Sequence, residues 1–488
     1  MSLSKIHYVN VGPKGTFHNR NDIQSVPGDI DAIIDHVGQQ NLKKIAIHFH
    51  GGLIKESSGM KIAEKMVSVF RDADSHGVTF VWETGLLETI SRNIDSIHQT
   101  RLFKKLLKLV IRHAGKRLGG IGGRGPGATI PYTEIEAELA RDIPFEDFNQ
   151  TEAESRGAGS LSETQLDAST ADLEQEIEED LEVDADEMEE LLKTEAPGTK
   201  LFDQARVSEA AAEEQARGIS TFITVAKAVA VIVKEVIRRY IKKTHHGFYP
   251  TVVEEILRYY YLADLGAWVW GGMKDAAHNM WLPNGGLDGL EQHAGTYFIE
   301  KLAALQAEHP ELIIDLVGHS AGSIAICEML KAAAEQHVSL KIRHILFLAP
   351  ACTSELMSSE VIAHPERYGR FRMFTMRDDY ESDNSLLKGV YTRSLLYFIA
   401  GVLEQRVDEP VAGMQRYLTG KEPYDKEPFL TVKRFLDQPG EDRLVLSNSQ
   451  RITPNAPPGL RTTAEEHGAF DDDGPTRASL TAIIKQQS

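Results

Sequence analysis

The sequence predicts an α/β fold in which a mostly parallel, doubly wound sheet is interrupted by a large, mainly helical insertion. Short apolar segments with strand character recur along the chain, and amphipathic helical patterns separate several of them. Strands that alternate with helices favour parallel pairing, because each parallel return needs a crossover connection. The alternation stops after residue 85 and resumes near residue 287. That interruption predicts the insertion.

The predicted strands fall into two groups. They are expected at Ile6–Val11, Lys44–Phe49, Val78–Trp82, Leu312–Val317, Arg343–Leu348, Phe371–Met376 and Arg443–Leu446. Helical spacing of apolar residues predicts helices at Met60–Asp72 and Leu287–Glu308 between them. We therefore expect one sheet built from residues 1–85 and 287–488, with residues 86–286 as an insertion or cap.

The insertion contains segments of contrasting composition. A basic amphipathic stretch at residues 101–117 is followed by the glycine-rich run Leu118–Ala128 and by a helical, aromatic block at Ile219–Trp281. The segment from about residue 133 to 218 is acidic, with twelve carboxylates and no basic residue between Asp172 and Glu190. Such a composition offers little apolar surface to bury, so this segment is predicted to be partly disordered.

Composition excludes several classes of function and setting. The chain has 488 residues and a formal net charge of -19, which argues against general nucleic-acid binding. Two cysteines and an N-terminus without a charged-then-apolar leader favour a reducing, cytoplasmic location. No stretch approaches the roughly 20 uninterrupted apolar residues that cross a bilayer. Nothing in the sequence predicts an oligomeric state.

Two stretches of the insertion suggest a peripheral contact with lipid. Residues 101–117 and 222–241 are amphipathic or apolar helices of the kind that lie on membrane surfaces. The alternative is that they pack on each other as an ordinary cap, since amphipathic helices usually bury their apolar face internally. The acidic run between Asp172 and Glu190 could also fold back over the basic stretch.

One serine lies in a pattern that predicts a catalytic nucleophile. The pentapeptide Gly318–Gly322 (GHSAG) follows an apolar strand and precedes the helical pattern Ser323–Ala333. This is the G-x-S-x-G elbow, in which a sharp turn from strand to helix holds the serine hydroxyl exposed, and glycines avoid clashes in the turn. Ser320 is the predicted nucleophile.

A serine nucleophile needs a base and an orienting acid, expected in the order Ser, then Asp or Glu, then His. His467 lies beyond the last predicted strand, before a short predicted helix, and is the predicted base. The acid is expected directly after the strand that ends at Met376. Asp378 is favoured there, with Asp379 as the alternate and Asp383 third.

An oxyanion hole requires backbone N–H groups aimed at the developing negative charge. Ala321, which follows the nucleophile, is expected to supply one of them. The segment His48–Leu53 (HFHGGL) follows an early strand, and either Gly52 or Leu53 is expected to supply the other. Gly120, Gly122 and Gly125 match G-x-G-x-x-G without the strand and helix that a dinucleotide site needs, so no cofactor or metal is expected.

The motifs GHSAG, HFHGGL, the strand end FTMRDD and HGAFDDD together resemble the serine hydrolases of the α/β-hydrolase superfamily, closest in style to bacterial lipases and esterases. The resemblance covers residues 1–85 and 287–488 and implies hydrolysis of carboxylic esters, including lipid-like ones, through an acyl-enzyme. Two alternatives stay open. The same triad serves acyltransferases and peptidases, and a catalytically silent fold of this kind can act as an interaction module.

Overall fold

The computed structural model describes residues 3–18, 23–52, 55–82, 87–119, 127–150, 162–182, 187, 190–191, 221–260, 266–447 and 456–486. Packing divides the chain into two compact units, which we describe separately. Unit 1 comprises Met1–Glu88, Trp270–Glu381 and Pro410–Ser488. Unit 2 comprises Thr89–Val269 and Ser382–Glu409.

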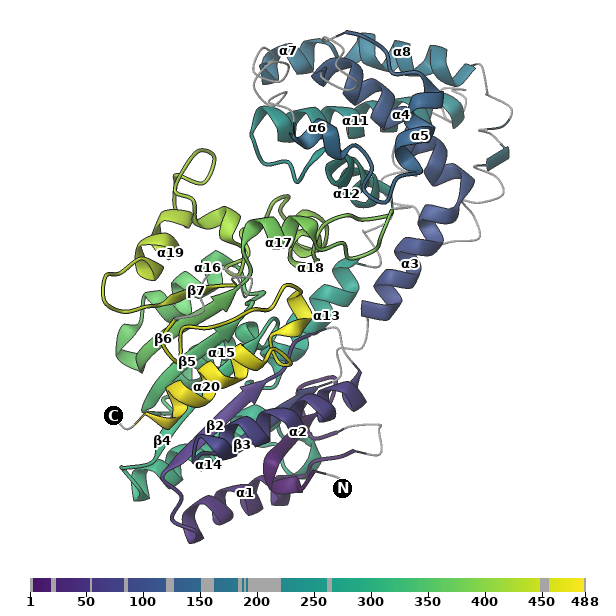
Figure 1. The fold of residues 1–488 in the computed structure, drawn as a ribbon. Coiled ribbons are helices and arrows are strands. Elements are labelled where there is room, and N and C mark those ends of the chain that lie inside the picture. Colours follow the sequence, from purple (N-terminus) through teal and green to yellow (C-terminus); the bar gives the residue numbers. More distant parts are fainter. Residues whose placement is uncertain are drawn as a thin grey trace. The chain divides into compact units, whose positions relative to one another are not determined.

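Unit 1 is built on a parallel sheet of seven strands with helices on both faces (Figure 1). The strands are β1 (Tyr8–Val11), β2 (Lys44–Phe49), β3 (His76–Trp82), β4 (Ile313–His319), β5 (Ile342–Leu348), β6 (Tyr368–Thr375) and β7 (Leu444–Leu446). Each overlaps a predicted strand, so the α/β class and the parallel sheet are confirmed. The largest shift is in β6, which begins three residues before the predicted Phe371.

The strand order β1-β3-β2-β4-β5-β6-β7 changes direction at β2. The chain places β3 on one side of β2 and then β4 on the other, and Phe49 of β2 pairs with Gly318 of β4. Parallel α/β sheets bind ligands outside the carboxyl ends of their strands at such a switch point. The segments that follow Phe49 and His319 therefore meet at the edge where a site is expected.

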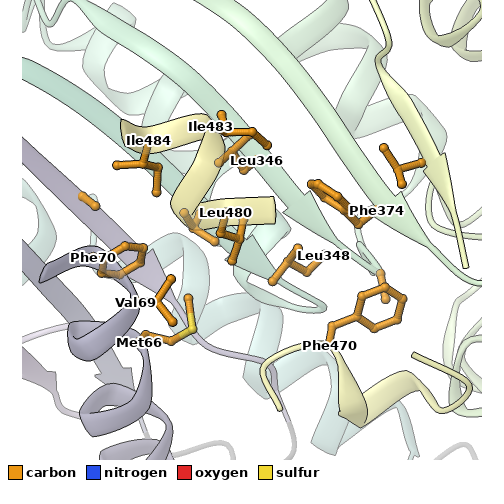
Figure 2. Packing of buried hydrophobic residues seen from close by; sticks show 14 of the residues in the cluster. Met66, Val69, Phe70, Leu346, Leu348, Phe374, Phe470, Leu480, Ile483 and Ile484 are labelled. Atoms are coloured by element: carbon orange, nitrogen blue, oxygen red, sulfur yellow. The ribbon is translucent and has the colours of Figure 1, made fainter. Parts of the chain in front are cut away.

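Helices that lie wholly or mostly in unit 1 accompany this sheet. They are α1 (Pro27–Gln39), α2 (Glu56–Asp72), α13 (Gly266–Asn279), α14 (Ala294–Glu308), α15 (Gly322–Glu335), α16 (Ser354–Met357), α17 (Asp378–Asp383), α19 (Phe429–Leu436) and α20 (Gly474–Lys485). Figure 2 shows the core on one face, where Phe70 of α2 and Leu480 of α20 pack with Leu346 of β5. Phe470, just before α20, belongs to the same core.

Unit 2 is helical in its described residues. Its helices are α3 (Leu87–Gln99), α4 (Arg101–Leu118), α5 (Tyr132–Leu139), α6 (Glu146–Gln150), α7 (Glu163–Ala168), α8 (Thr170–Glu182), α11 (Thr221–Ile241), α12 (Phe248–Tyr260) and α18 (Leu395–Phe398). The apolar face of α11 packs against α4, α8 and α12. Within these residues, no helix has the length and apolar character that would let it cross a bilayer.

Part of the acidic segment is an ordered helix. Leu173, Ile177 and Leu181 of α8 recur at helical spacing and are buried, so the helix has an apolar face despite its charge. Residues 151–161, 183–186 and 192–220, for which disorder is also predicted, lie outside the described residues.

The boundaries of the two units differ from those expected for a single insertion at residues 86–286. Residues 270–286 pack with unit 1, and Ser382–Glu409 pack with unit 2 although they follow the predicted acid-bearing strand. Unit 2 is thus assembled from two separated pieces of chain. The expected boundary near residue 85 falls within residues 83–86, outside the described residues.

Candidate active site

The serine of the GHSAG motif lies on a tight turn between β4 and α15. Ser320 has a φ of 50°, a left-handed conformation that is strained for a residue with a side chain. A Cβ atom at Gly318 would lie 2.8 Å from the carbonyl carbon of Gly322, and one at Gly322 would overlap the carbonyl oxygen of Phe49. The turn is therefore closed to any residue larger than glycine at both positions.

Hydrogen bonds to neighbouring strand ends hold the turn in place. The N–H of Ser320 donates to the carbonyl of Leu348 at 2.9 Å, and the N–H of Ala351 donates to the carbonyl of Ser320 at 3.0 Å. The hydroxyl of Ser323 donates to that same carbonyl at 2.6 Å. These bonds satisfy the backbone of the strained residue and leave its hydroxyl available to another group.

That group is His467. Its Nε2 lies 2.9 Å from the Oγ of Ser320, although the two residues are 147 positions apart in the sequence. His467 begins a short 3₁₀ turn, η10 (His467–Ala469), and Phe470 directly after it is anchored in the core of unit 1 (Figure 2). The anchor fixes where the imidazole is presented to the serine.

His467 is set up as a neutral base. Burial, aided by the nearby positive charge of His319, lowers the pKa of His467 to about 3. A neutral imidazole that accepts the Ser320 hydroxyl proton at Nε2 carries its own hydrogen on Nδ1. Among the described residues, Nδ1 of His467 has no hydrogen-bond partner.

A second buried histidine joins the elbow to the histidine-bearing turn. Nδ1 of His319 lies 2.7 Å from Oδ2 of Asp471, and its Nε2 lies 3.0 Å from the carbonyl oxygen of His467. Both partners can only accept, so both ring nitrogens of His319 must carry hydrogens. His319 is therefore an imidazolium held between a carboxylate and a backbone carbonyl.

The opposite charges of His319 and Asp471 each stabilise the ionised form of the other. Burial opposes the charged form of His319, but the carboxylate of Asp471 raises its pKa above the usual value. Burial likewise opposes ionisation of Asp471, yet His319 holds the pKa of that carboxyl well below its usual range. Nε2 of His48 on β2 lies 3.8 Å from Oδ1 of Asp471, too far for a hydrogen bond.

The glycines after β2 lie beside the elbow. A Cβ atom at Gly52 would lie 2.8 Å from the Cβ of Ala321, so the two backbones approach closely, and the side chain of Met273 on α13 covers Gly52. At the start of α15, the N–H groups of Ser323 and Ile324 donate to the carbonyls of Ser320 at 3.0 Å and Ala321 at 2.9 Å. The expected donors Ala321 and Gly52 are thus neighbours, while Leu53 lies outside the described residues.

His50, in the same segment, has a fixed tautomer. Its Nε2 accepts from the N–H of Trp82 at 3.2 Å, so its Nδ1 donates to the carbonyl of Gly51 at 2.6 Å. Its ring stacks on that of Trp82 at 4.4 Å, and burial lowers the pKa of His50 to about 4. His50 is a neutral support of the glycine loop.

The four carboxylates of α17 differ sharply in exposure. Asp378 is half-buried, and its N–H donates to Oε1 of Gln415 at 2.8 Å. Asp379 is 51% exposed and pairs with Arg377 at 2.9 Å, and Asp383 is exposed. Glu381 is fully buried. None of the four hydrogen-bonds to Nδ1 of His467.

The structure therefore brings Ser320, His467, Ala321 and Gly52 together, and neither predicted acid, Asp378 or Asp379, hydrogen-bonds to Nδ1 of His467. His319 and Asp471 are parts of the site that motif reading did not assign. A signal for Asp471 existed, because HGAFDDD places carboxylates on the first turn after the predicted base. Within the described residues, no group of three or more His, Cys, Asp or Glu could hold a metal ion.

The two stretches considered for lipid contact bury their apolar faces within unit 2. Leu102, Leu106 and Leu109 of α4 and most described apolar residues of α11 are buried. Basic residues of α4 pair with the acidic segment, including Arg112 with Asp180 at 3.0 Å. These contacts favour the packed alternative over a lipid-facing one.

Comparisons of the chain with models of protein families, with curated proteins and with solved structures find no match.

Proposed function

We propose that this protein is a serine hydrolase that cleaves carboxylic esters through an acyl-enzyme on Ser320. The observation that carries the proposal is the 2.9 Å contact between Oγ of Ser320 and Nε2 of His467. It occurs at a strained turn and at the switch point of a parallel sheet, where α/β folds place their sites. The fold that this proposal invokes is that of the α/β-hydrolases.

The chemistry follows from the positions of these groups. Neutral His467 takes the hydroxyl proton at Nε2 as Oγ of Ser320 attacks the acyl carbonyl. The N–H groups of Ala321 and Gly52 hold the oxyanion of the tetrahedral intermediate. His467 then gives the proton to the leaving alcohol, and water releases the acyl group through the same base.

The proposed mechanism also includes a carboxylate that orients the imidazole of His467. Asp378 is retained because it follows β6 directly, with Asp379 as the alternate, and Glu381 joins them because it is fully buried on the same helix. Replacing each by its amide and measuring the rate of esterase turnover distinguishes them. The amide of the true acid should lower kcat by up to about 10⁴-fold, as loss of the triad acid does elsewhere.

The reaction class is tested with a fluorophosphonate probe, which reacts with an activated serine. The wild-type protein should be labelled, and Ser320→Ala should lose labelling and lower kcat about 10⁴- to 10⁶-fold. Ser479→Ala is the matched control, because it removes another buried hydroxyl of unit 1, one that donates to the backbone of Arg461. Its labelling should persist.

Folded wild-type protein that resists labelling would instead favour a silent interaction module. A panel of esters of increasing acyl length then separates a long-chain lipase from a short-chain esterase. Added alcohol or amine acceptors reveal acyl transfer, because the acyl group then leaves on the acceptor rather than on water.

A further inference from the structure

We propose that the His319–Asp471 pair is a positioning device for the proposed base, which fixes the turn carrying His467 and keeps the His467 imidazole neutral. The inference rests on the proposed function and adds two residues that motif reading left unassigned. It concerns how the base is held, whatever acyl group the enzyme takes.

The geometry gives the pair a mechanical role. The ring of His319 bonds to the turn at two points, Oδ2 of Asp471 at 2.7 Å and the carbonyl oxygen of His467 at 3.0 Å. His319 itself is the neighbour of Ser320 at the end of β4. One rigid ring therefore links the nucleophile's strand to both ends of the base's turn, which sets the distance from Oγ to Nε2.

The same pair has an electrostatic role. The rings of His319 and His467 lie 5.7 Å apart, so the imidazolium disfavours a second positive charge on His467. Asp471 acts on His467 with the opposite sign but more weakly. Of the titratable groups that the structure describes, the buried imidazoles of His48 and His50 also lie beside the pair.

A purely structural reading would treat the pair as a buried ion pair that stabilises the fold. The two readings separate in the pH dependence of the reaction. In His319→Gln the lone carboxylate of Asp471 remains near His467, so the acid limb of kcat/KM should move to higher pH by about one unit or more. In Asp471→Asn, His319 loses its counter-charge and its proton, and the limb should move upward by less.

The rate at the plateau of the pH profile should also fall. Misplacement of the base by a fraction of its hydrogen-bond length should lower kcat/KM about 10- to 100-fold in either variant. The double variant His319→Gln/Asp471→Asn removes the unpaired buried charge that His319→Gln leaves. Its thermal stability should therefore exceed that of His319→Gln, while its plateau stays low.

His344→Gln is the matched control. His344 is another buried histidine of the sheet, on β5, and its Nδ1 lies 2.9 Å from a buried carboxylate, that of Asp315. This variant should lose stability without moving the acid limb or the plateau. An acid limb that stays unchanged in both His319→Gln and Asp471→Asn, or that moves equally in His344→Gln, overturns the inference.

A measurement on the folded wild type covers the case in which the variants do not fold. In ¹⁵N-histidine-labelled protein, both ring nitrogens of His319 should show protonated shifts at a pH just above the ordinary imidazole pKa of about 6.5. A neutral His319 at that pH overturns the inference. Wild-type protein that shows this signal but resists fluorophosphonate removes the proposed function instead, so the two failures are distinguishable.

Discussion

Each unit of the molecule buries a cluster of histidine and carboxylate side chains, and the two clusters differ in the hydrogen bonds that their central histidine makes. In unit 2, His246 bonds to Glu254 at 2.8 Å through Nδ1 and to Asp408 at 2.9 Å through Nε2. Arg239 and Tyr391 each add a 2.5 Å bond to Glu254. Both ring nitrogens of this histidine are bound to other side chains of the same unit.

In unit 1, the corresponding histidine, His467, hydrogen-bonds to a serine and, within the part of the chain that the structure describes, to no carboxylate. Nε2 of His467 meets the hydroxyl of Ser320, which is itself held in a strained turn. Nδ1 of His467 has no hydrogen-bond partner among the described residues. We expect that breaking the unit 2 network costs stability, because it leaves a buried charge without its partner, and that changing the unit 1 cluster affects the proposed proton transfer.

The largest expected effect is on turnover in unit 1. His467→Ala should lower kcat about 10⁴- to 10⁶-fold, because the base that takes the Ser320 proton is removed. Its unfolding midpoint should change little, since the side chain makes few bonds to the rest of the fold. Initial rates with a chromogenic ester and denaturant titration measure the two quantities. A folded variant with wild-type turnover would remove His467 from the mechanism.

The equivalent change in unit 2 should act on stability. His246→Ala removes the partner of Glu254 and Asp408 and should cost about 3–5 kcal/mol of unfolding free energy, as breaking a buried charge network does. Hydrogen exchange, measured on peptides from α11 and α12, should show that the loss of stability lies in these helices. The neighbouring His245, which is half-buried and stacks on Tyr240, is the control, and His245→Ala should lose much less. Equal losses would contradict the comparison.

Acid should weaken the two clusters in different pH windows. The pKa of His467 is lowered from 6.5 to about 3, so its buried neutral ring costs no stability above pH 6.5 and costs increasingly more as the pH falls toward 3. Burial alone would raise the pKa of Glu254, but His246 and Arg239 lower it from 4.5 to about 2, so its contribution is lost below 4.5.

Hydrogen exchange over this pH range measures both windows. Between about pH 6.5 and 4.5, stability in unit 1 should fall by up to about 1.4 kcal/mol per pH unit for each such histidine, while the unit 2 cluster holds. His467→Ala should flatten the decline in unit 1. Simultaneous loss of protection in both units near pH 6 would contradict the assignment.

The smallest effect is expected at the surface of unit 2. Glu176 on α8 pairs with Lys116 at 3.0 Å and Arg117 at 3.3 Å on α4, and these groups are partly exposed. Glu176→Gln should cost about 0–1 kcal/mol and lose its effect in high salt. Glu179→Gln is the control, because its exposed carboxylate bonds to the neutral Gln175. A loss above about 2 kcal/mol would mean that this surface contact stabilises unit 2 about as strongly as a buried ion pair does, and would contradict the comparison.

The sequence predicted the sheet because its strands are short apolar runs between turn-forming residues, a local signal. The contact between Ser320 and His467 could also be expected from the sequence, because the elbow has a local pattern and the order of the triad limits the search for a base. The pairing of His319 with Asp471 joins residues 152 positions apart, and no local pattern encodes it. It depends on a turn whose conformation follows from burial of Phe470.

Two differences between expectation and structure have physical causes. The high charge of the acidic run predicts disorder, whereas the spacing of Leu173, Ile177 and Leu181 gives α8 a buried apolar face, and α8 packs against α4 and α11. The association of Ser382–Glu409 with unit 2 includes contacts between distant segments, such as that of His246 with Asp408. Composition alone carries no information about such a contact.

The register between β2 and β4 has a consequence for the order in which the chain is made. Lys44 pairs with Ile313, so the N-terminal strands are synthesised long before their central neighbour, and most of unit 2 is made in between. Domains tend to fold as they emerge, and contacts distant in sequence form slowly. His467 comes later still. A ribosome-bound chain therefore carries an unpaired edge of β2 until Ile313–His319 has been made, and the Ser–His pair can assemble only after His467 follows.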